Sequence, residues 1–357
     1  MGKVLMKGNE AIGEAAIRAG CLNYFAYPIT PQSEVAEYLA RRMPEVGGVF
    51  LQGESEVAVG YMIFGAAGCG ARVFTTSSSP GISLMSEALS YITCAQCPAV
   101  FVNIMRGGPG LGGILPSQGD YFQATKGGGH GDYRLLVMAP ASVQEAVEMV
   151  MAAFPLAEKY RNPVMILGDG LIGQMMEPVA FPEDLLSEPS NKDDWATTGI
   201  GNRSGDTPNL VKSLFLDPAQ LNDHNLLLKA KYDRMRRDEV RYEAYNMDGD
   251  YRVLIVSYGT MSRVCRTAID SLKKEGLEVA MIRPQTLFPF PEAAIREAAG
   301  KEGCRLAVSI EMSMGQMVED VERSIQGRCP VEWYGKCGGE VPTPEEIVDV
   351  VRGLLQR

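Results

Sequence analysis

Polar residues that could bind an anion or move a proton follow four of the apolar runs in the first half of the chain. These groups are Thr30-Pro31, Glu54-Ser55-Glu56, residues 76–81 and Arg106. Hydroxyl groups and an arginine bind anions, and a carboxylate can accept or donate a proton in catalysis. The residue types therefore predict a site that holds an anionic substrate beside a proton-handling carboxylate.

A purely structural interpretation of these residues is also open. Thr30, Ser55 and Ser79 are suitable helix N-caps, and the two nearby glutamates suit the first turn of a helix. Capping does not account for Arg106, which lies beside a glycine-rich stretch. We therefore favour the binding site over the capping interpretation.

A parallel sheet is the element that would bring these loops together, because its strands present their carboxyl ends at one edge. Short apolar runs alternate with segments of helical periodicity, which predicts such a sheet with helices on both faces. We expect strands at 24–29, 49–51, 71–75, 99–105, 135–138 and 163–167, and helices at 31–42, 56–69, 81–92 and 142–158.

The chain divides into three parts, consistent with the roughly two domains expected for its length. Residues 1–176 form a first α/β domain, 177–250 a polar crossover with a solvated helix and no strands, and 251–357 a second α/β domain. In the second domain we expect strands at 252–256, 277–282, 305–310 and 331–334, and helices at 260–274, 291–299, 315–326 and 344–356.

Composition restricts the function and the location of the protein. The 44 acidic residues exceed the 34 basic ones for a net charge of −10, which argues against nucleic acid as a partner. No apolar run is long enough for a membrane span, which takes about 18 residues. The first residues run into a helix-like segment without a secretory signal, so we predict a cytoplasmic protein.

Cysteine and histidine offer little for a metal centre. Of the eight cysteines only Cys94 and Cys97 lie close together, whereas an iron–sulfur cluster or a zinc ribbon needs several grouped thiolates. Buried free thiols are the expected state of this pair. The two histidines, His130 and His224, leave little material for a histidine-based catalytic site.

Three glycine motifs imitate cofactor sites. Residues 108–113 match a dinucleotide pattern, but Pro109 and the missing helix favour a glycine-rich active-site loop. Gly168-Asp169-Gly170 with Asn191 imitates a diphosphate motif, but prolines interrupt the helix that this motif requires, so we expect no such site. The third motif is the glycine-rich loop 126–132. Its His130 could bind a substrate carboxylate or cap a turn, and both interpretations stay open.

Several motifs together resemble the alpha subunit of 2-oxoacid:ferredoxin oxidoreductases, and they cover nearly the whole chain. Stretches 107–113 and 124–132 are most similar to the 2-oxoisovalerate (branched-chain) branch. The motifs are Gly8-Asn9-Glu10-Ala11, Tyr27-Pro28-Ile29-Thr30-Pro31, Glu54-Ser55-Glu56, residues 75–81, Arg106-Gly107-Gly108-Pro109, Ser117-Gln118-Gly119-Asp120, Ser257-Tyr258-Gly259-Thr260, Leu287-Phe288-Pro289-Phe290-Pro291 and Glu311-Met312-Ser313-Met314-Gly315-Gln316.

The resemblance implies a division of labour between subunits. This chain is then a pyrimidine-binding-like domain of a thiamine-diphosphate enzyme followed by a transketolase C-terminal-like domain. A beta subunit would hold the diphosphate with Mg²⁺. A gamma subunit and a ferredoxin-like delta subunit with [4Fe-4S] clusters would complete the complex, which passes electrons to ferredoxin.

The resemblance also assigns roles to residues. Glu56 aligns with the acid that hydrogen-bonds the aminopyrimidine ring of thiamine diphosphate and so promotes the cofactor's deprotonation, with Glu54 as a rival. Thr30 and Arg106 align with groups that hold the substrate carboxylate, and Gln118 and Asp120 are expected in the same pocket. Pro28, Ile29 and Ser79 are expected to contact the cofactor.

The function implied is oxidative decarboxylation of a 2-oxoacid such as 2-oxoisovalerate to acyl-CoA and CO₂, with reduction of ferredoxin. A subunit specific for 2-oxoglutarate or pyruvate is the first alternative. A non-redox thiamine-diphosphate enzyme is an alternative of another class. A non-enzymatic scaffold is the remaining class of function. A scaffold would not need Glu56, Thr30 and Arg106 to lie together at the carboxyl ends of the strands.

Overall fold

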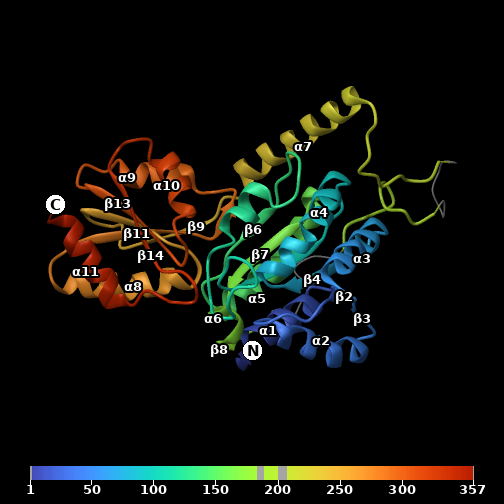
Figure 1. Cartoon of the computed structure of the whole chain (residues 1–357), viewed down its shortest axis with the longest axis horizontal. Helices are drawn as coiled ribbons and strands as arrows, with labels where there is room; N and C mark the ends of the chain where they lie inside the picture. The colour runs from blue at the N-terminus through green and yellow to red at the C-terminus, as the bar shows by residue number, and fades with distance from the viewer. Residues whose placement is uncertain (1, 183–188, 200–206, 357) are drawn as a thin grey trace.

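A computed structural model describes residues 2–182, 189–199 and 207–356 and shows two α/β units side by side (Figure 1). The first unit is built on a seven-stranded sheet whose strands are parallel except at one edge. In sheet order the strands are β12 (Thr286–Phe288), β6 (Leu136–Met138), β7 (Val164–Asp169), β5 (Val100–Met105), β4 (Val73–Ser77), β2 (Asn23–Ala26) and β3 (Val49–Gln52).

Helices cover both faces of this sheet, as predicted (Figure 1). Helix α1 (Gly8–Arg18) packs between α2 (Ser33–Glu45) and α5 (Val143–Tyr160), and α3 (Glu56–Gly68) packs against α4 (Ser79–Cys94). Serine N-caps begin two of these helices. The hydroxyl groups of Ser55 and Ser142 accept hydrogen bonds from backbone N–H groups in the first turns of α3 and α5.

The second unit has a five-stranded sheet with one antiparallel edge strand. Its strands in order are β14 (Val331–Gly335), β13 (Leu306–Glu311), β10 (Val253–Val256), β11 (Val279–Pro284) and β9 (Tyr242–Tyr245). Helices α8 (Gly259–Lys274) and α11 (Pro344–Leu355) pack together on one side of the sheet, and α9 (Glu292–Ala299) and α10 (Met317–Ile325) on the other.

The prediction that 177–250 lacks strands was wrong. Strand β8 (Met176–Val179) begins at its boundary and pairs antiparallel with β1 (Val4–Lys7), where the sequence indicated a helix. Strand β9 lies within it and pairs with β11. These four-residue strands are stabilised by distant partners, and four residues are too few to show a periodic pattern.

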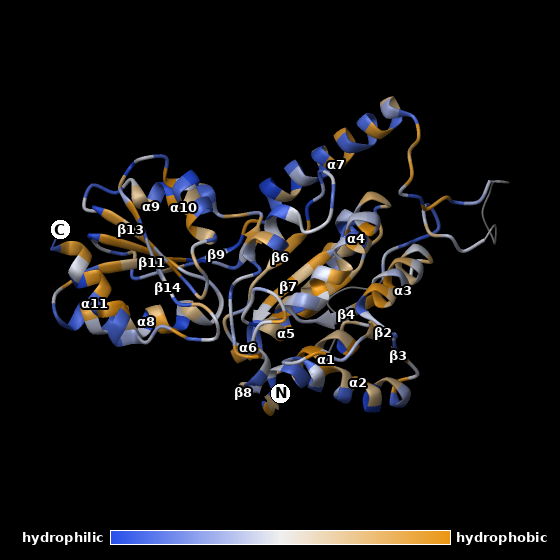
Figure 2. Ribbon diagram, viewed as in Figure 1, coloured by the Kyte–Doolittle hydropathy of each residue, from blue (hydrophilic) through white to orange (hydrophobic). Residues whose placement is uncertain are grey.

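The predicted connecting helix is α7 (Pro218–Asp238), which is largely hydrophilic (Figure 2). One side of it is nevertheless buried against the first unit, through Leu228, Lys231, Tyr232 and Met235. Short elements α6 (Gly170–Gln174) and η1 (Gln123–Gly127) complete the chain. No described helix combines the length and the apolar character that crossing a membrane requires.

The two units share an apolar core. Strands coloured as hydrophobic fill the interior of both sheets (Figure 2). The larger cluster of buried side chains continues from Phe101 and Ile166 in the first sheet to Ile282 and Ile295 in the second unit. Strand β12 reinforces this junction, because a segment of the second unit completes the sheet of the first.

Candidate active site

The structure brings the four predicted loops together at the carboxyl edge of the first sheet. Arg106, directly after β5, donates from Nη1 to the carbonyl oxygen of Thr30 at 2.8 Å. Its backbone N–H donates to Ser79 Oγ, at the start of α4, at 3.0 Å. Gly81 lies against the Glu56 side chain, since a Cβ on Gly81 would come within 2.8 Å of Glu56 Oε1.

Glu56 is a buried carboxylate in the first turn of α3. Its side chain is 6% exposed, and among the described residues no hydrogen bond or ion pair engages its carboxylate. Burial of an unpaired carboxylate is costly, although the N-terminus of a helix offsets part of this cost. Glu54, the rival acid, is exposed. An unpaired buried acid at a sheet edge indicates a group that meets a ligand.

Asp120 is held beside Ser79 by two hydrogen bonds. Ser79 Oγ donates to Asp120 Oδ2 at 2.6 Å, and Asn103 Nδ2 donates to the same oxygen at 2.9 Å. Burial raises the pKa of Asp120, while the bonds from Ser79 and Asn103 and the charge of Arg106 act in the opposite direction. Asp120 therefore joins the cluster of Ser79 and Arg106.

Further polar atoms at this edge are buried and lack partners among the described residues. They include the hydroxyl groups of Ser77 and Ser78, Nε of Arg106 and Nε2 of Gln32. Buried polar atoms in native proteins are nearly always hydrogen-bonded. A concentration of unpaired donors and acceptors beside Glu56 therefore indicates a place for a polar ligand.

The glycine-rich stretch after Arg106 forms a tight loop and no helix, in agreement with the interpretation as an active-site loop. Arg106 Nη2 donates to the carbonyl oxygen of Leu111 at 2.9 Å, and Gly113 N–H donates to that of Gly107 at 2.8 Å. A Cβ on Gly112 would lie 1.8 Å from the Gly107 oxygen, and the φ of Gly112 is +62°. Only glycine fits this position.

Gln118 lies between the two units, with its side chain fully buried. Its Nε2 donates to the carbonyl oxygen of Tyr258 at 2.9 Å, and its Oε1 accepts from Met312 N–H at 2.9 Å. Both ends of the amide are thus bound to the second unit. The structure does not bring this side chain into contact with Glu56 or Arg106.

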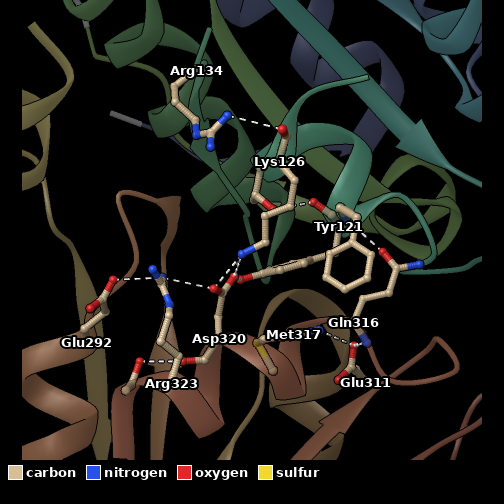
Figure 3. A network of polar contacts seen from close by, with 12 residues as sticks. Tyr121, Lys126, Arg134, Glu292, Glu311, Gln316, Met317, Asp320 and Arg323 are labelled. Atoms are coloured by element: carbon tan, nitrogen blue, oxygen red, sulfur yellow. Dashed lines mark hydrogen bonds and ion pairs between the residues drawn. The ribbon is translucent and has the colours of Figure 1, made fainter. Parts of the chain in front are cut away.

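The second unit also supports the segment that carries Asp120. Gln316 accepts from Phe122 N–H at 2.8 Å and donates to the Gly119 carbonyl oxygen at 2.7 Å. Tyr121 donates from its hydroxyl group to Asp320 at 2.6 Å (Figure 3). The second unit therefore positions residues on both sides of Asp120.

The remaining predicted residues lie near the edge but make fewer contacts there. Thr30 is exposed and contributes its carbonyl oxygen to Arg106, Pro28 is exposed, and Ile29 is half-buried. His130 is exposed, and its carbonyl oxygen accepts from Ser90 Oγ at 2.8 Å. These observations leave the side chain of His130 outside the cluster.

Asp169 and Asn191 are engaged in separate contacts. The Asp169 carboxylate caps α6 and accepts from Thr260 Oγ1 at 3.0 Å, whereas Asn191 Oδ1 accepts from Asp193 N–H at 2.9 Å. Cys97 is buried and Cys94 half-buried, both as free thiols. Within the described ranges, no group of three or more His, Cys, Asp and Glu side chains is arranged to hold a metal ion.

Two contributors to the site were missed from the sequence. Asn103 holds Asp120, and an amide within the apolar run 99–105 was the available signal. Tyr24 is the second: its buried hydroxyl donates to Oγ1 of Thr76, a member of the predicted group 76–81, at 2.7 Å, and Thr76 donates to Gln32 Oε1. The tyrosine in β2 carried no comparable signal, since tyrosine is common in strands.

Family models match two long segments of the chain. Residues 14–213 match "Pyruvate flavodoxin/ferredoxin oxidoreductase, thiamine diP-bdg", and residues 252–347 match "Pyruvate:ferredoxin oxidoreductase core domain II". The two matches correspond to the two units of the structure.

Curated relatives match over nearly their whole length. The chain is 48% identical to ketoisovalerate oxidoreductase subunit VorB of Methanothermobacter thermautotrophicus, over 99% of this chain and 98% of the relative. It is 39% identical to 2-oxoglutarate synthase subunit KorA of Archaeoglobus fulgidus, over 98% of this chain and 99% of the relative.

Solved structures give the same fold. A 2-oxoglutarate:ferredoxin oxidoreductase from Magnetococcus marinus matches with a TM-score of 0.84 and 29% identity, over 98% of this chain and 65% of that chain. A split-gene transketolase matches with a TM-score of 0.61 at 15% identity, over 98% of both chains, which concerns the fold alone. The chain is therefore an α/β protein with a thiamine-diphosphate-binding domain and a transketolase C-terminal-like domain, and it belongs to the 2-oxoacid:ferredoxin oxidoreductase family as an alpha-type subunit.

Proposed function

We propose that this chain is the alpha subunit of a complex that oxidatively decarboxylates 2-oxoisovalerate to the corresponding acyl-CoA and CO₂ and reduces ferredoxin. The substrate follows from the 48% identity with a ketoisovalerate oxidoreductase subunit, against 39% with the 2-oxoglutarate synthase subunit. The observation that carries the proposal is Glu56, a buried carboxylate whose oxygens are unused within the described residues.

The site fits the pyrimidine end of thiamine diphosphate. The ring needs an acid at one nitrogen and polar partners around it, and Glu56 Oε1 and the unpartnered Ser77 hydroxyl both lie against Gly81. When bound, thiamine diphosphate supplies the carbon nucleophile that attacks the 2-oxo group. Glu56 holds the proton shared with the ring nitrogen, while Pro28, Ile29 and Ser79 line the cofactor's position.

Arg106 and its neighbours would receive the substrate carboxylate. Nη1 and Nη2 of Arg106 each bind one carbonyl oxygen, so the guanidinium is oriented and still has N–H groups to donate, including the unpartnered Nε. Thr30 contributes from the adjoining loop. Asp120 faces the same cluster, and Gln118 acts on the pocket through the segment that carries Asp120.

Partner chains would supply the remaining components. We assign Mg²⁺ and the diphosphate to a beta subunit, and [4Fe-4S] clusters to a ferredoxin-like delta subunit, with a gamma subunit completing the complex. We place the complex in the cytoplasm. We also propose the division of the chain at residues 176 and 250, with β9 and β12 as strands that cross between its parts.

Purification of the tagged chain with its partners, followed by viologen reduction in the presence of coenzyme A, tests the proposal. We expect dependence on thiamine diphosphate and a kcat/KM for 2-oxoisovalerate at least about tenfold above those for 2-oxoglutarate and pyruvate. A higher kcat/KM for 2-oxoglutarate would contradict the assignment of 2-oxoisovalerate as the substrate. Turnover of a 2-oxoacid without viologen reduction would favour a non-redox thiamine enzyme.

A further inference from the structure

A pocket of about 600 Å³ lies at the junction of the two units, and none of its lining residues belongs to the cluster around Glu56. Its walls come from η1, the end of α7, β12 and helices α9 and α10. Pockets of this volume commonly hold small molecules. A shallower hollow adjoins it and shares Ala293, Arg296 and Glu297 with it.

Basic side chains dominate both depressions, although the chain as a whole carries a charge of −10. The pocket is lined by the basic residues Lys126, Arg134, Arg236, Arg237, Arg296 and Arg323. Its acidic residues are Glu292, Glu297 and Asp320. The hollow adds Lys301 and Arg328 and no further acid. Such a local excess of positive charge attracts anions.

Two of the acids are already neutralised inside the pocket. Lys126 Nζ lies 2.6 Å from Asp320 Oδ1, and Arg323 Nη2 bridges Asp320 at 3.0 Å and Glu292 at 2.8 Å (Figure 3). These pairs fix the floor of the pocket. They balance the charges of Lys126 and Arg323, and Arg236 and Arg237 are paired with Asp233 and Asp238 on α7.

Four basic residues around the pocket and the hollow have no carboxylate partner within the described ranges. Arg134 donates to the carbonyl oxygens of Lys126 and Tyr133, and Arg296 donates to that of Ser324. Lys301 and Arg328 likewise donate to backbone carbonyl oxygens. Glu297 lines both depressions and offsets one of these charges, so positive charge is still in excess, and each arginine retains N–H groups that suit phosphate oxygens.

An apolar wall faces the charged residues. It is formed by Leu287, Phe288, Phe290 and Pro291, and the Arg236 guanidinium lies 5.2 Å from the centre of the Phe288 ring. A flat aromatic base would pack against such a wall, while phosphates would meet the arginines.

We propose that this pocket binds a nucleoside polyphosphate, with its phosphates at Arg134, Arg296 and the adjoining hollow and its base against Phe288 and Phe290. The volume of about 600 Å³ and the combination of apolar wall and arginines favour a small molecule over an acidic protein segment. The residues of this pocket are other than those assigned to the reaction at the sheet edge.

Isothermal titration calorimetry on the full chain tests the proposal, with ADP, pyrophosphate and adenosine as probes. We expect ADP to bind with a Kd below about 1 mM, pyrophosphate more weakly, and adenosine too weakly to detect. The double variant Arg134→Ala/Arg296→Ala should weaken ADP binding at least about tenfold. Arg41→Ala, an exposed arginine on α2, is the matched control and should leave the Kd unchanged.

A second pair of variants keeps the test decisive if the first fails to fold. Lys301→Ala/Arg328→Ala changes two exposed side chains of the hollow and should weaken ADP binding at least about threefold. Absence of ADP binding, equal binding of adenosine and ADP, or unchanged Kd in the folded variants would overturn the proposal. Loss of ADP binding when the chain assembles with its partners would identify an acidic protein surface as the occupant instead, and would also overturn it.

Discussion

Replacement of Glu56 by glutamine should have opposite effects on stability and on activity. The carboxylate is 6% exposed and unpaired within the described residues, so the folded chain bears the cost of removing a charge from water. That cost is several kcal/mol for a fully buried ion, and the N-terminus of α3 offsets about 0.3–1 kcal/mol of it. Neither oxygen of Glu56 is among the fully buried unpartnered atoms, so water still reaches the carboxylate, and we expect Glu56→Gln to stabilise the chain by no more than about 1 kcal/mol.

Activity should fall, because the glutamine amide cannot share a proton with the cofactor ring. General acid–base groups typically contribute 10²-fold to 10⁴-fold, so turnover of the assembled complex should decrease by about that factor. Denaturant unfolding of the isolated chain measures the first effect, and viologen reduction by the reconstituted complex measures the second. Glu54→Gln is the matched control, because Glu54 is exposed two residues earlier. It should change stability by less than about 0.5 kcal/mol and leave turnover unchanged.

Three results would refute this reasoning. A destabilised Glu56→Gln variant would mean that the carboxylate has a structural partner. Near-normal turnover in an intact complex would remove Glu56 from the proton-transfer role. A large loss of turnover in Glu54→Gln alone would transfer that role to the rival acid.

Further predictions concern the surroundings of the site. Arg106→Ala should raise the KM for the 2-oxoacid about tenfold or more and leave the KM for coenzyme A nearly unchanged; equal effects on both would contradict a carboxylate-binding role. Gly112→Ala should destabilise the chain by more than about 2 kcal/mol in denaturant unfolding, because its Cβ would lie 1.8 Å from a carbonyl oxygen. Asp320→Ala should cost about 1–3 kcal/mol by the same measurement, since it leaves the buried Tyr121 hydroxyl without its partner while Lys126 and Arg323 remain solvated, whereas a cost below about 0.5 kcal/mol would exclude a role in joining the units. Burial lowers the pKa of Lys231 from its ordinary 10.5 to about 7. Between these values the unfolded chain binds one more proton than the folded chain, so stability should rise with pH, and Lys231→Met should abolish this slope in thermal unfolding at pH 7 and pH 9.5.

Local sequence signals were sufficient for most helices and central strands. The apolar run predicted at 99–105 is β5, and the helix predicted at 56–69 is α3, because periodicity and a serine N-cap act over a few residues. The same signals failed for β1, β8 and β9. Each of these strands has four residues, too few for a periodic pattern, and pairing with a distant segment makes them strands.

The amino-acid sequence alone was enough to establish the family, the order of the two α/β units and the convergence of Thr30, Glu56, Ser79 and Arg106 at one sheet edge. The family followed from the resemblance of motifs along the chain, and the convergence followed from residue types next to short strands, because the strand ends of a parallel sheet meet at one edge. Tertiary structure decided which acid is buried: Glu56, in the first turn of α3, is packed against the sheet edge, whereas Glu54, before the N-cap Ser55, is exposed. It also decided that Gln118 joins the units and that Arg134 and Arg296 share one pocket. Such contacts link residues more than a hundred positions apart, and their free energy comes from packing that no local spacing encodes.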